Sequence, residues 1–118
     1  MASSVDETVA GSDPRGAPVP GGASVRVLAG FFEGLEYPVD RDWLVIGRGR
    51  GADLVLAEPT ISRTHAAIGY DAEARGFFVQ DLGSTNGTYL NGAATKRGPL
   101  KAGDQLQMGK LRVRLSLP

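Results

Sequence analysis

Glycine interrupts this chain so often that long helices are disfavoured. Seventeen of the 118 residues are glycine, and no window of about ten residues carries the apolar spacing of an amphipathic helix. Between the glycines stand short runs of β-favouring residues, each followed by turn residues. These runs cover residues 25–28, 35–37, 43–46, 67–70, 77–80, 88–90, 105–108 and 111–117. The pattern predicts an all-β domain, a sandwich or a barrel.

The clearest strand pattern lies at the C-terminal end. Residues 111–117 alternate apolar and polar side chains without a break, which is the period of a strand with one buried face. We expect this strand to run to Pro118 and to close the domain.

Residues 1–22 have the composition of a segment that builds no core. They are mainly Ser, Gly, Pro, Ala and acidic residues, and three acids minus Arg15 leave a net charge of −2. We therefore predict a disordered tail over 1–22 and one folded domain over 23–118. The tail lacks the apolar run of a signal peptide, and no segment is long and apolar enough to span a membrane. We expect a cytoplasmic protein with no membrane contact.

The composition excludes several kinds of site. Thirteen basic and thirteen acidic residues give zero formal charge, which disfavours a protein that coats nucleic acid. The chain has no cysteine and a single histidine, His65, so thiol chemistry and most metal sites are excluded. We expect no metal and no cofactor.

Three polar, glycine-rich segments separate the predicted strands, and loops are where a sandwich places its binding groups. Residues 47–51 offer two guanidinium groups, and residues 60–65 offer an arginine beside hydroxyls. Residues 83–88 offer hydroxyls, an amide and accessible backbone N–H groups. Such donors suit a small anion site, although glycine, serine and asparagine are also ordinary turn residues.

Three motifs occur in a fixed order: Gly47-Arg48, then Ser62-Arg63-Thr64-His65, then Ser84-Thr85-Asn86-Gly87-Thr88, with Asn91-Gly92 following. Their order, spacing and flanks resemble the signature of the forkhead-associated (FHA) domain, and the resemblance covers about residues 25–117. Each motif alone is weak, but the ordered set is specific. The resemblance implies an FHA-type β-sandwich of about eleven strands, with loops at one end that bind phosphothreonine peptides.

The resemblance assigns phosphate contacts to three residues. Arg48 presents a forked, permanently charged donor pair, and glycines on both sides are expected to let its backbone take an exposed loop conformation. Ser62 and Thr85 are short hydroxyl donors on two further loops. All three are expected to bind the phosphate directly.

Other residues are expected to contact the peptide or the rim of the site. Arg63 adds charge at the rim, where it would contact phosphate or peptide backbone. Asn86 has the donors and the acceptor needed to hold the peptide main chain beside the phosphothreonine. Thr60 resembles a position that meets the side chain three residues after the phosphothreonine. Arg50 is expected to be a solvated loop cation.

Four residues are expected to support the binding loops. Gly47 and Gly87 lie within the loop motifs, and Asn91 is expected to take the left-handed conformation of an Asn-Gly turn. His65 is expected to tie one binding loop to another by hydrogen bonds. It also stands three residues after Ser62, as a general base would, so a Ser62–His65 hydrolase is an alternative that we disfavour, since no orienting carboxylate is apparent.

Two segments resemble nucleotide-binding motifs but lack features that those motifs require. Residues 47–52 fit G-x-G-x-x-A, but Pro59 prevents the long helix that this fingerprint requires. Residues 103–110 resemble a P-loop with the wrong spacing and no Ser or Thr after Lys110.

These observations predict a non-catalytic phosphothreonine-recognition module in Ser/Thr kinase signalling. Its partners would be a phosphothreonine protein and a Ser/Thr kinase. The module's own tail is a second candidate ligand, since Thr8 follows Asp6-Glu7 in a context suited to acidophilic kinases. The alternative is an interaction module that binds its partner without phosphate.

Overall fold

The computed structural model describes residues 19–118; Thr8 and the rest of residues 1–18 lie outside the described part. Within the described part the chain forms eleven strands and no helix. The strands are β1 (Ser24–Val27), β2 (Glu36–Pro38), β3 (Trp43–Gly47), β4 (Leu54–Val55), β5 (Ala66–Asp71), β6 (Gly76–Asp81), β7 (Thr88–Leu90), β8 (Ala93–Ala94), β9 (Arg97–Leu100), β10 (Gln105–Met108) and β11 (Leu111–Ser116). The all-β prediction of about eleven strands is confirmed.

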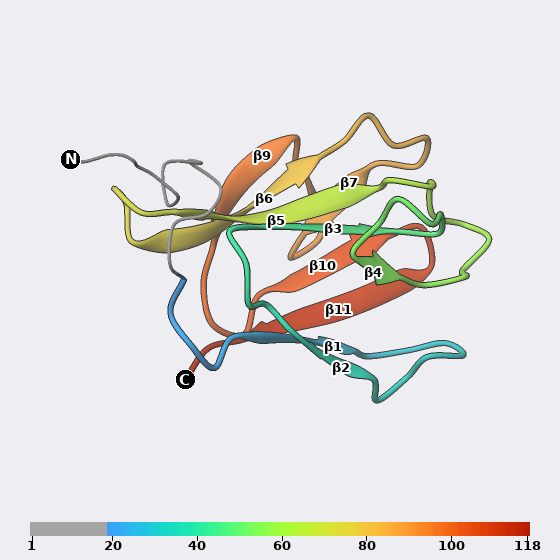
Figure 1. Cartoon of the computed structure of the whole chain (residues 1–118). Helices are drawn as coiled ribbons and strands as arrows, with labels where there is room; N and C mark the ends of the chain where they lie inside the picture. Colours follow the sequence, from blue (N-terminus) through green and yellow to red (C-terminus); the bar gives the residue numbers. More distant parts are fainter. Residues whose placement is uncertain (1–18) are drawn as a thin grey trace.

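The strands form two sheets that pack as a sandwich (Figure 1). One sheet has six strands in the order β2-β1-β11-β10-β7-β8, and the other has five in the order β4-β3-β5-β6-β9. All pairs are antiparallel except β3 with β4, which run parallel. Because β4 runs parallel to β3, the chain turns back through residues 48–53 before β4 pairs with β3.

The core lies between the sheets and follows the two-residue period of the strands. The five-stranded sheet contributes Leu44, Ile46, Ile68 and Val79, and none of these side chains is exposed. The six-stranded sheet contributes the alternate residues of β1, β10 and β11. The polar residues between them face outward, so the alternation in the sequence specifies which face of each strand is buried.

The last strand is shorter than the alternating sequence predicts. Residues Leu111–Ser116 are in β11, whereas Leu117 and Pro118 are not. Ser116 pairs with Ser24, the first residue of β1, so no partner strand remains beyond it, and Pro118 has no N–H to donate.

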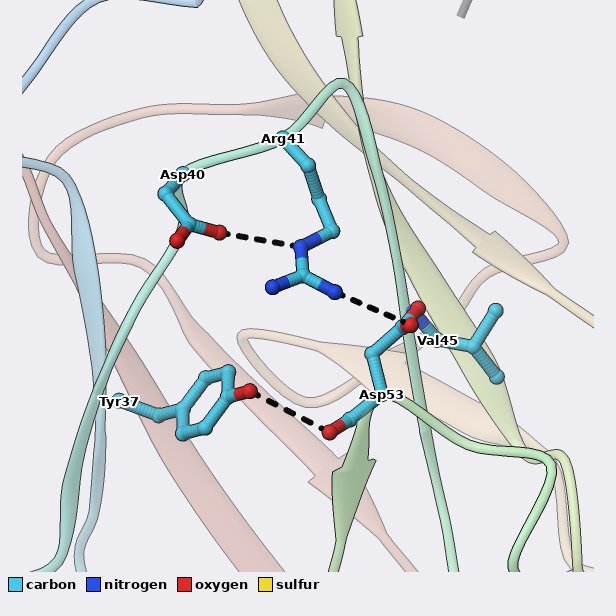
Figure 2. A network of polar contacts seen from close by, with 5 residues as sticks. All are labelled: Tyr37, Asp40, Arg41, Val45 and Asp53. Atoms are coloured by element: carbon cyan, nitrogen blue, oxygen red, sulfur yellow. Dashed lines mark hydrogen bonds and ion pairs between the residues drawn. The ribbon is translucent and has the colours of Figure 1, made fainter.

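A polar network joins β2 and the loop after it to Asp53, the residue directly before β4 (Figure 2). The Tyr37 hydroxyl donates to the Asp53 carbonyl at 3.3 Å, and the Asp53 carboxylate accepts the Val45 N–H at 2.8 Å. Arg41 bridges the carboxylates of Asp40 and Asp53 at 3.0 and 3.1 Å. The network anchors the end of the loop that follows β3.

The loops after β3, β4 and β6 lie at one end of the sandwich, together with the β1–β2 hairpin and the β10–β11 turn (Figure 1). The described start of the chain and the C-terminus lie toward the other end. No helix occurs over residues 19–118, so none of the described chain is a membrane-spanning helix.

The Asn-Gly turn between β7 and β8 forms as predicted. Asn91 and Gly92 have φ angles of 49° and 89°, the left-handed conformation expected of this turn. The Asn91 amide donates to Asp104 at 3.0 Å and accepts the Gln105 N–H at 2.9 Å. Asn91 therefore joins the β7–β8 turn to the start of β10.

Replacement of Asn91 separates the contribution of its backbone conformation from that of its two side-chain hydrogen bonds. We expect Asn91→Ala to lower the free energy of unfolding by about 2–3 kcal/mol, because alanine is strained at this φ and makes neither hydrogen bond. Asn91→Gly keeps the backbone conformation and should lose about 1 kcal/mol less. Urea unfolding measures both values, and equal losses would show that the φ angle contributes nothing.

Candidate functional site

Backbone hydrogen bonds join the loop after β3 to the loop before β5. The Arg48 N–H donates to the Ser62 carbonyl at 3.0 Å, and the Gly49 N–H donates to the Arg63 carbonyl at 3.1 Å. Two of the three predicted binding loops therefore lie against each other, and the position of Arg48 is set by the backbone of the Ser62 segment.

Gly47 and Gly49 are required here for a different reason from the one expected. Neither has a positive φ, so the backbone does not need glycine for its conformation. A Cβ on Gly47 would lie 2.0 Å from the Arg63 carbonyl oxygen, and one on Gly49 would lie 3.0 Å from the Arg63 Cβ. The two glycines therefore allow the close approach of two loops.

His65 joins the second loop to the third from a fully buried position. Its Nδ1 accepts the Ser62 N–H at 3.0 Å, and its Nε2 lies 2.8 Å from the Gly87 carbonyl. Because Nδ1 is an acceptor, a neutral imidazole carries its proton on Nε2 and donates it to Gly87. Both ring nitrogens are thus bonded to backbone groups and neither to the Ser62 hydroxyl, which is not the arrangement of a nucleophile and its base.

Three side-chain donors are left available where the loops meet. The Ser62 Oγ accepts the Thr85 N–H at 3.0 Å, and its hydroxyl proton has no acceptor within residues 19–118. The exposed Thr85 hydroxyl likewise has none there. Arg48 uses Nε on the Ile61 carbonyl at 2.9 Å, which fixes the side chain while both Nη groups remain without an acceptor in the described chain. The three donors come from three different loops.

Asn86 and Thr60 make a further connection between loops. The Asn86 amide donates to the Thr60 carbonyl at 2.8 Å, which leaves its oxygen and one N–H for a ligand. The Thr60 hydroxyl donates to Glu58 and accepts the Lys110 N–H at 2.8 Å. Because this hydroxyl is already used, a peptide contact by Thr60 would come through its methyl group.

Two guanidinium groups stand at the edge of the site. Arg63 and Arg50 are exposed, and neither side chain makes a hydrogen bond or ion pair with residues 19–118. Arg63 follows Ser62 directly, whereas Arg50 lies two residues beyond Arg48.

Known proteins with this sequence pattern and fold identify the family. The FHA domain model matches residues 44–109, more than half of the chain. The oxoglutarate dehydrogenase inhibitor of Corynebacterium diphtheriae is 35% identical over 106 residues, which are 90% of this chain and 71% of the relative. This chain belongs to the FHA domain family.

A further relative and a solved structure also resemble this FHA domain in sequence and in fold. Glycogen accumulation regulator GarA of Mycobacterium tuberculosis is 36% identical over 94 residues, 80% of this chain and 57% of GarA. This chain thus spans little more than half of that relative's length. A structure solved in a study of phosphothreonine-dependent FHA domain interactions aligns with a TM-score of 0.73 at 28% identity, covering 81% of this chain and 96% of the other.

Asp81 organises the third loop of the FHA domain. Its carboxylate accepts the N–H groups of Gly83 and Ser84 at 3.0 and 3.1 Å and the hydroxyls of Ser84 and Thr88 at 2.5 and 2.8 Å. Burial opposes ionisation of Asp81, but these hydrogen bonds outweigh it and lower the pKa below the ordinary 3.8. Gly87, with a φ of 82°, completes the loop and presents its carbonyl to His65.

Glu58 and Lys110 belong to the loop framework and were not anticipated from the sequence. Hydrogen bonds from the Thr60 hydroxyl and then the Thr60 N–H lower the pKa of Glu58. A carboxylate two residues before a hydroxyl, with Pro59 between them, is a turn signal that a sequence reading could have used. The Lys110 contact joins residues fifty positions apart and leaves no local pattern.

One predicted support, Asn91, lies away from the place where the binding loops touch. Asn91 bonds to the start of β10 and makes none of the loop-to-loop contacts described above. Two hollows of about 510 and 540 Å³ are lined by other parts of the chain, the first by residues within 19–24 and 36–40 and the second by residues within 71–78 and 97–101. Arg48, Ser62 and Thr85 line neither hollow, and a phosphate does not need one, since it is bound by hydrogen bonds more than by enclosure. Residues 19–118 contain no group of three or more acidic, cysteine or histidine side chains able to hold a metal ion.

Gly47→Ala tests the close approach of the loops. We expect it to lower the free energy of unfolding by more than about 2 kcal/mol, because the loop must move away from the Arg63 carbonyl. Gly51→Ala is the matched control: a Cβ there meets nothing within 4 Å and the φ is not positive, so its stability should be unchanged or slightly higher. Equal losses in the two variants would contradict the packing argument.

Asp81→Asn tests the third loop and gives a pH dependence. A lowered pKa in the folded state means that the ionised carboxylate stabilises the protein above pH about 4 and that this contribution disappears as the pH falls through the lower, folded-state pKa. We expect Asp81→Asn to lose about 2 kcal/mol at pH 7 and to show a weaker loss of stability than wild type below pH about 4. Parallel acid curves for the two proteins would refute this role.

Proposed function

We propose that this FHA domain is a non-catalytic module that binds phosphothreonine peptides. The observation that carries the proposal is that Arg48, Ser62 and Thr85 lie on three loops joined by hydrogen bonds, while the Arg48 Nη groups and the two hydroxyl protons have no acceptor within residues 19–118. A phosphate dianion supplies the acceptors that these donors lack.

The affinity expected of such a site is moderate. Three or four charge-assisted hydrogen bonds at about 1.5–3 kcal/mol each support micromolar binding after the entropy of association is subtracted. Asn86 would add contacts to the peptide main chain, and Arg63 would add a contact that weakens with salt. The loops are already joined to one another by hydrogen bonds, so little ordering is required when the peptide binds.

The biological role that we propose is regulation of a partner protein in Ser/Thr kinase signalling. Two relatives carry regulatory names, an oxoglutarate dehydrogenase inhibitor and a glycogen accumulation regulator. The bonding of His65 to backbone groups supports a role without catalysis. The partner would carry a phosphothreonine written by a Ser/Thr kinase, and we propose that both meet this protein in the cytoplasm.

We further propose that the folded module is residues 23–118, that residues 1–22 are a tail, and that phosphorylated Thr8 binds the module's own site. Residues 19–25 have fixed positions in the structure, so the tether is the eleven residues that lead from Thr8 to Val19. A random coil of that length spans roughly 18 Å, and a fully extended chain spans about 36 Å. β1 begins at the end of the sandwich away from the binding loops (Figure 1). The distance to those loops is about the length of a six-residue strand such as β11, or about 20 Å. The reach is sufficient, and tethering gives an effective concentration of about a millimolar.

Arg48→Ala tests the phosphate site. We expect phosphopeptide binding to weaken by at least about 30-fold, because a charged phosphate loses its forked donor, while the melting temperature stays within a few degrees. Arg50→Ala removes the same charge two residues away and should change the affinity less than about threefold. Calorimetry with one phosphothreonine peptide measures both variants. Undiminished binding by Arg48→Ala would refute the site and favour a phosphate-independent module.

Phosphorylation of Thr8 tests the tail. NMR of the Thr8-phosphorylated chain should show shifts at Arg48, Ser62 and Thr85 that do not depend on protein concentration, and a phosphothreonine peptide should bind more weakly. Thr8→Ala treated with the same kinase is the control. Absent shifts, or shifts that grow with protein concentration, would overturn the intramolecular contact.

A further inference from the structure

The outer face of the six-stranded sheet carries three arginines that make no ion pair with any carboxylate of residues 19–118. Arg112 and Arg114 are the outward residues of β11, Arg26 is the outward residue of β1, and all three are exposed. The two ion pairs within residues 19–118 both belong to Arg41. We call Arg26, Arg112 and Arg114 the arginine face.

The register of the sheet places like charges together on this face. Arg26 is directly opposite Arg114, an arrangement in which the two Cβ atoms are about 5 Å apart and the charges repel. Glu36, opposite Arg26 on β2, is the acidic residue in register with the face. An exposed strand position accepts threonine or glutamine equally well, so folding does not require these charges.

Polar side chains and a shallow hollow continue the face toward β7. Gln105 is paired with Arg114, and Gln107 with Arg112. A hollow of about 320 Å³ lies beside them, lined by Tyr89, Asn91, Gly92, Gln105, Leu106, Gln107 and Arg112. The hollow thus offers amide groups to a peptide main chain next to a guanidinium that suits a carboxylate.

The arginine face begins close to the phosphate-binding loops. Lys110, whose N–H donates to the Thr60 hydroxyl, lies in the turn between β10 and β11, two residues before Arg112. From there the arginines extend along β11 to the middle of β1. One polypeptide could therefore occupy both surfaces.

We propose that the arginine face is a second docking surface, which binds an acidic segment of a protein partner without requiring phosphothreonine. Each arginine can bind a carboxylate through two N–H groups, and an acidic segment removes the repulsion between Arg26 and Arg114. Three arginines on a chain of zero net charge are few for a nucleic-acid surface, where affinity grows with the number of phosphates neutralised. On a partner that also carries phosphothreonine, the two contacts reinforce each other.

The test uses a fluorescein-labelled octaglutamate peptide and fluorescence anisotropy at low salt. The triple variant Arg26→Gln, Arg112→Gln, Arg114→Gln should weaken binding about tenfold, the sum of three exposed charge contacts. The matched control is Arg75→Gln, Lys96→Gln, Lys101→Gln, which removes the same charge from other exposed positions and should change the affinity less than about twofold. The arginine-face variant should unfold at the same urea concentration as wild type or a higher one.

Octaglutamate binding to the Arg48→Ala variant distinguishes docking on the arginine face from binding at the phosphate site. Octaglutamate should bind that variant with nearly the wild-type affinity, and NMR shifts should appear at Arg112, Arg114 and Gln107. The inference is overturned by equal weakening in the two triple variants, by shifts confined to Arg48, Ser62 and Thr85, or by a large loss of stability without the arginines. Tighter binding of an oligothymidylate of equal charge would also overturn it, in favour of nucleic acid.

Discussion

The site depends on one buried imidazole. His65 accepts a backbone N–H from its own loop through Nδ1 and bonds the Gly87 carbonyl of the next loop through Nε2. Because the side chain is fully buried, loss of either bond would leave an unpaired polar group in the core. The imidazole thereby holds the Ser62 loop and the Thr85 loop in a fixed relation, and the Ser62 Oγ then receives the Thr85 N–H. The donors that we propose for phosphate are consequently positioned before any ligand arrives.

Other contacts at this end of the sandwich also hold the loops in place before a ligand binds. The absence of a Cβ at Gly47 lets the Arg48 loop lie against the Arg63 backbone, Asp81 gathers four donors within the third loop, and Thr60 reaches the β10–β11 turn. Arg48, Ser62 and Asn86 each use one part of a polar side chain on a neighbouring loop and leave the rest free of partners in the described chain. Such preorganisation reduces the ordering cost of binding a peptide.

Much of this fold could be predicted from local patterns, and the failures have physical causes. The alternation over residues 111–117 predicts β11, although the strand ends at Ser116 and not at Pro118 as expected. β4 and β8 have two residues each, and β9 contains Gly98 and Pro99, so none of the three carries a strand pattern. In the site, the motifs pointed to the loops that meet, whereas the reason for Gly47 and the Glu58–Thr60–Lys110 contacts depends on residues distant in sequence. Periodicity in a sequence does not contain that information.

The central claim is that the loops recognise a phosphothreonine and not merely a polypeptide. The most direct measurement is calorimetry of one peptide sequence in three forms, with threonine, phosphoserine or phosphothreonine at the same position. The account predicts micromolar affinity for the phosphothreonine form, weaker binding of the phosphoserine form, since a γ-methyl is worth about 0.8 kcal/mol and also restricts the rotamer, and no detectable binding of the unphosphorylated form. Equal affinity for the phosphorylated and unphosphorylated peptides would contradict it.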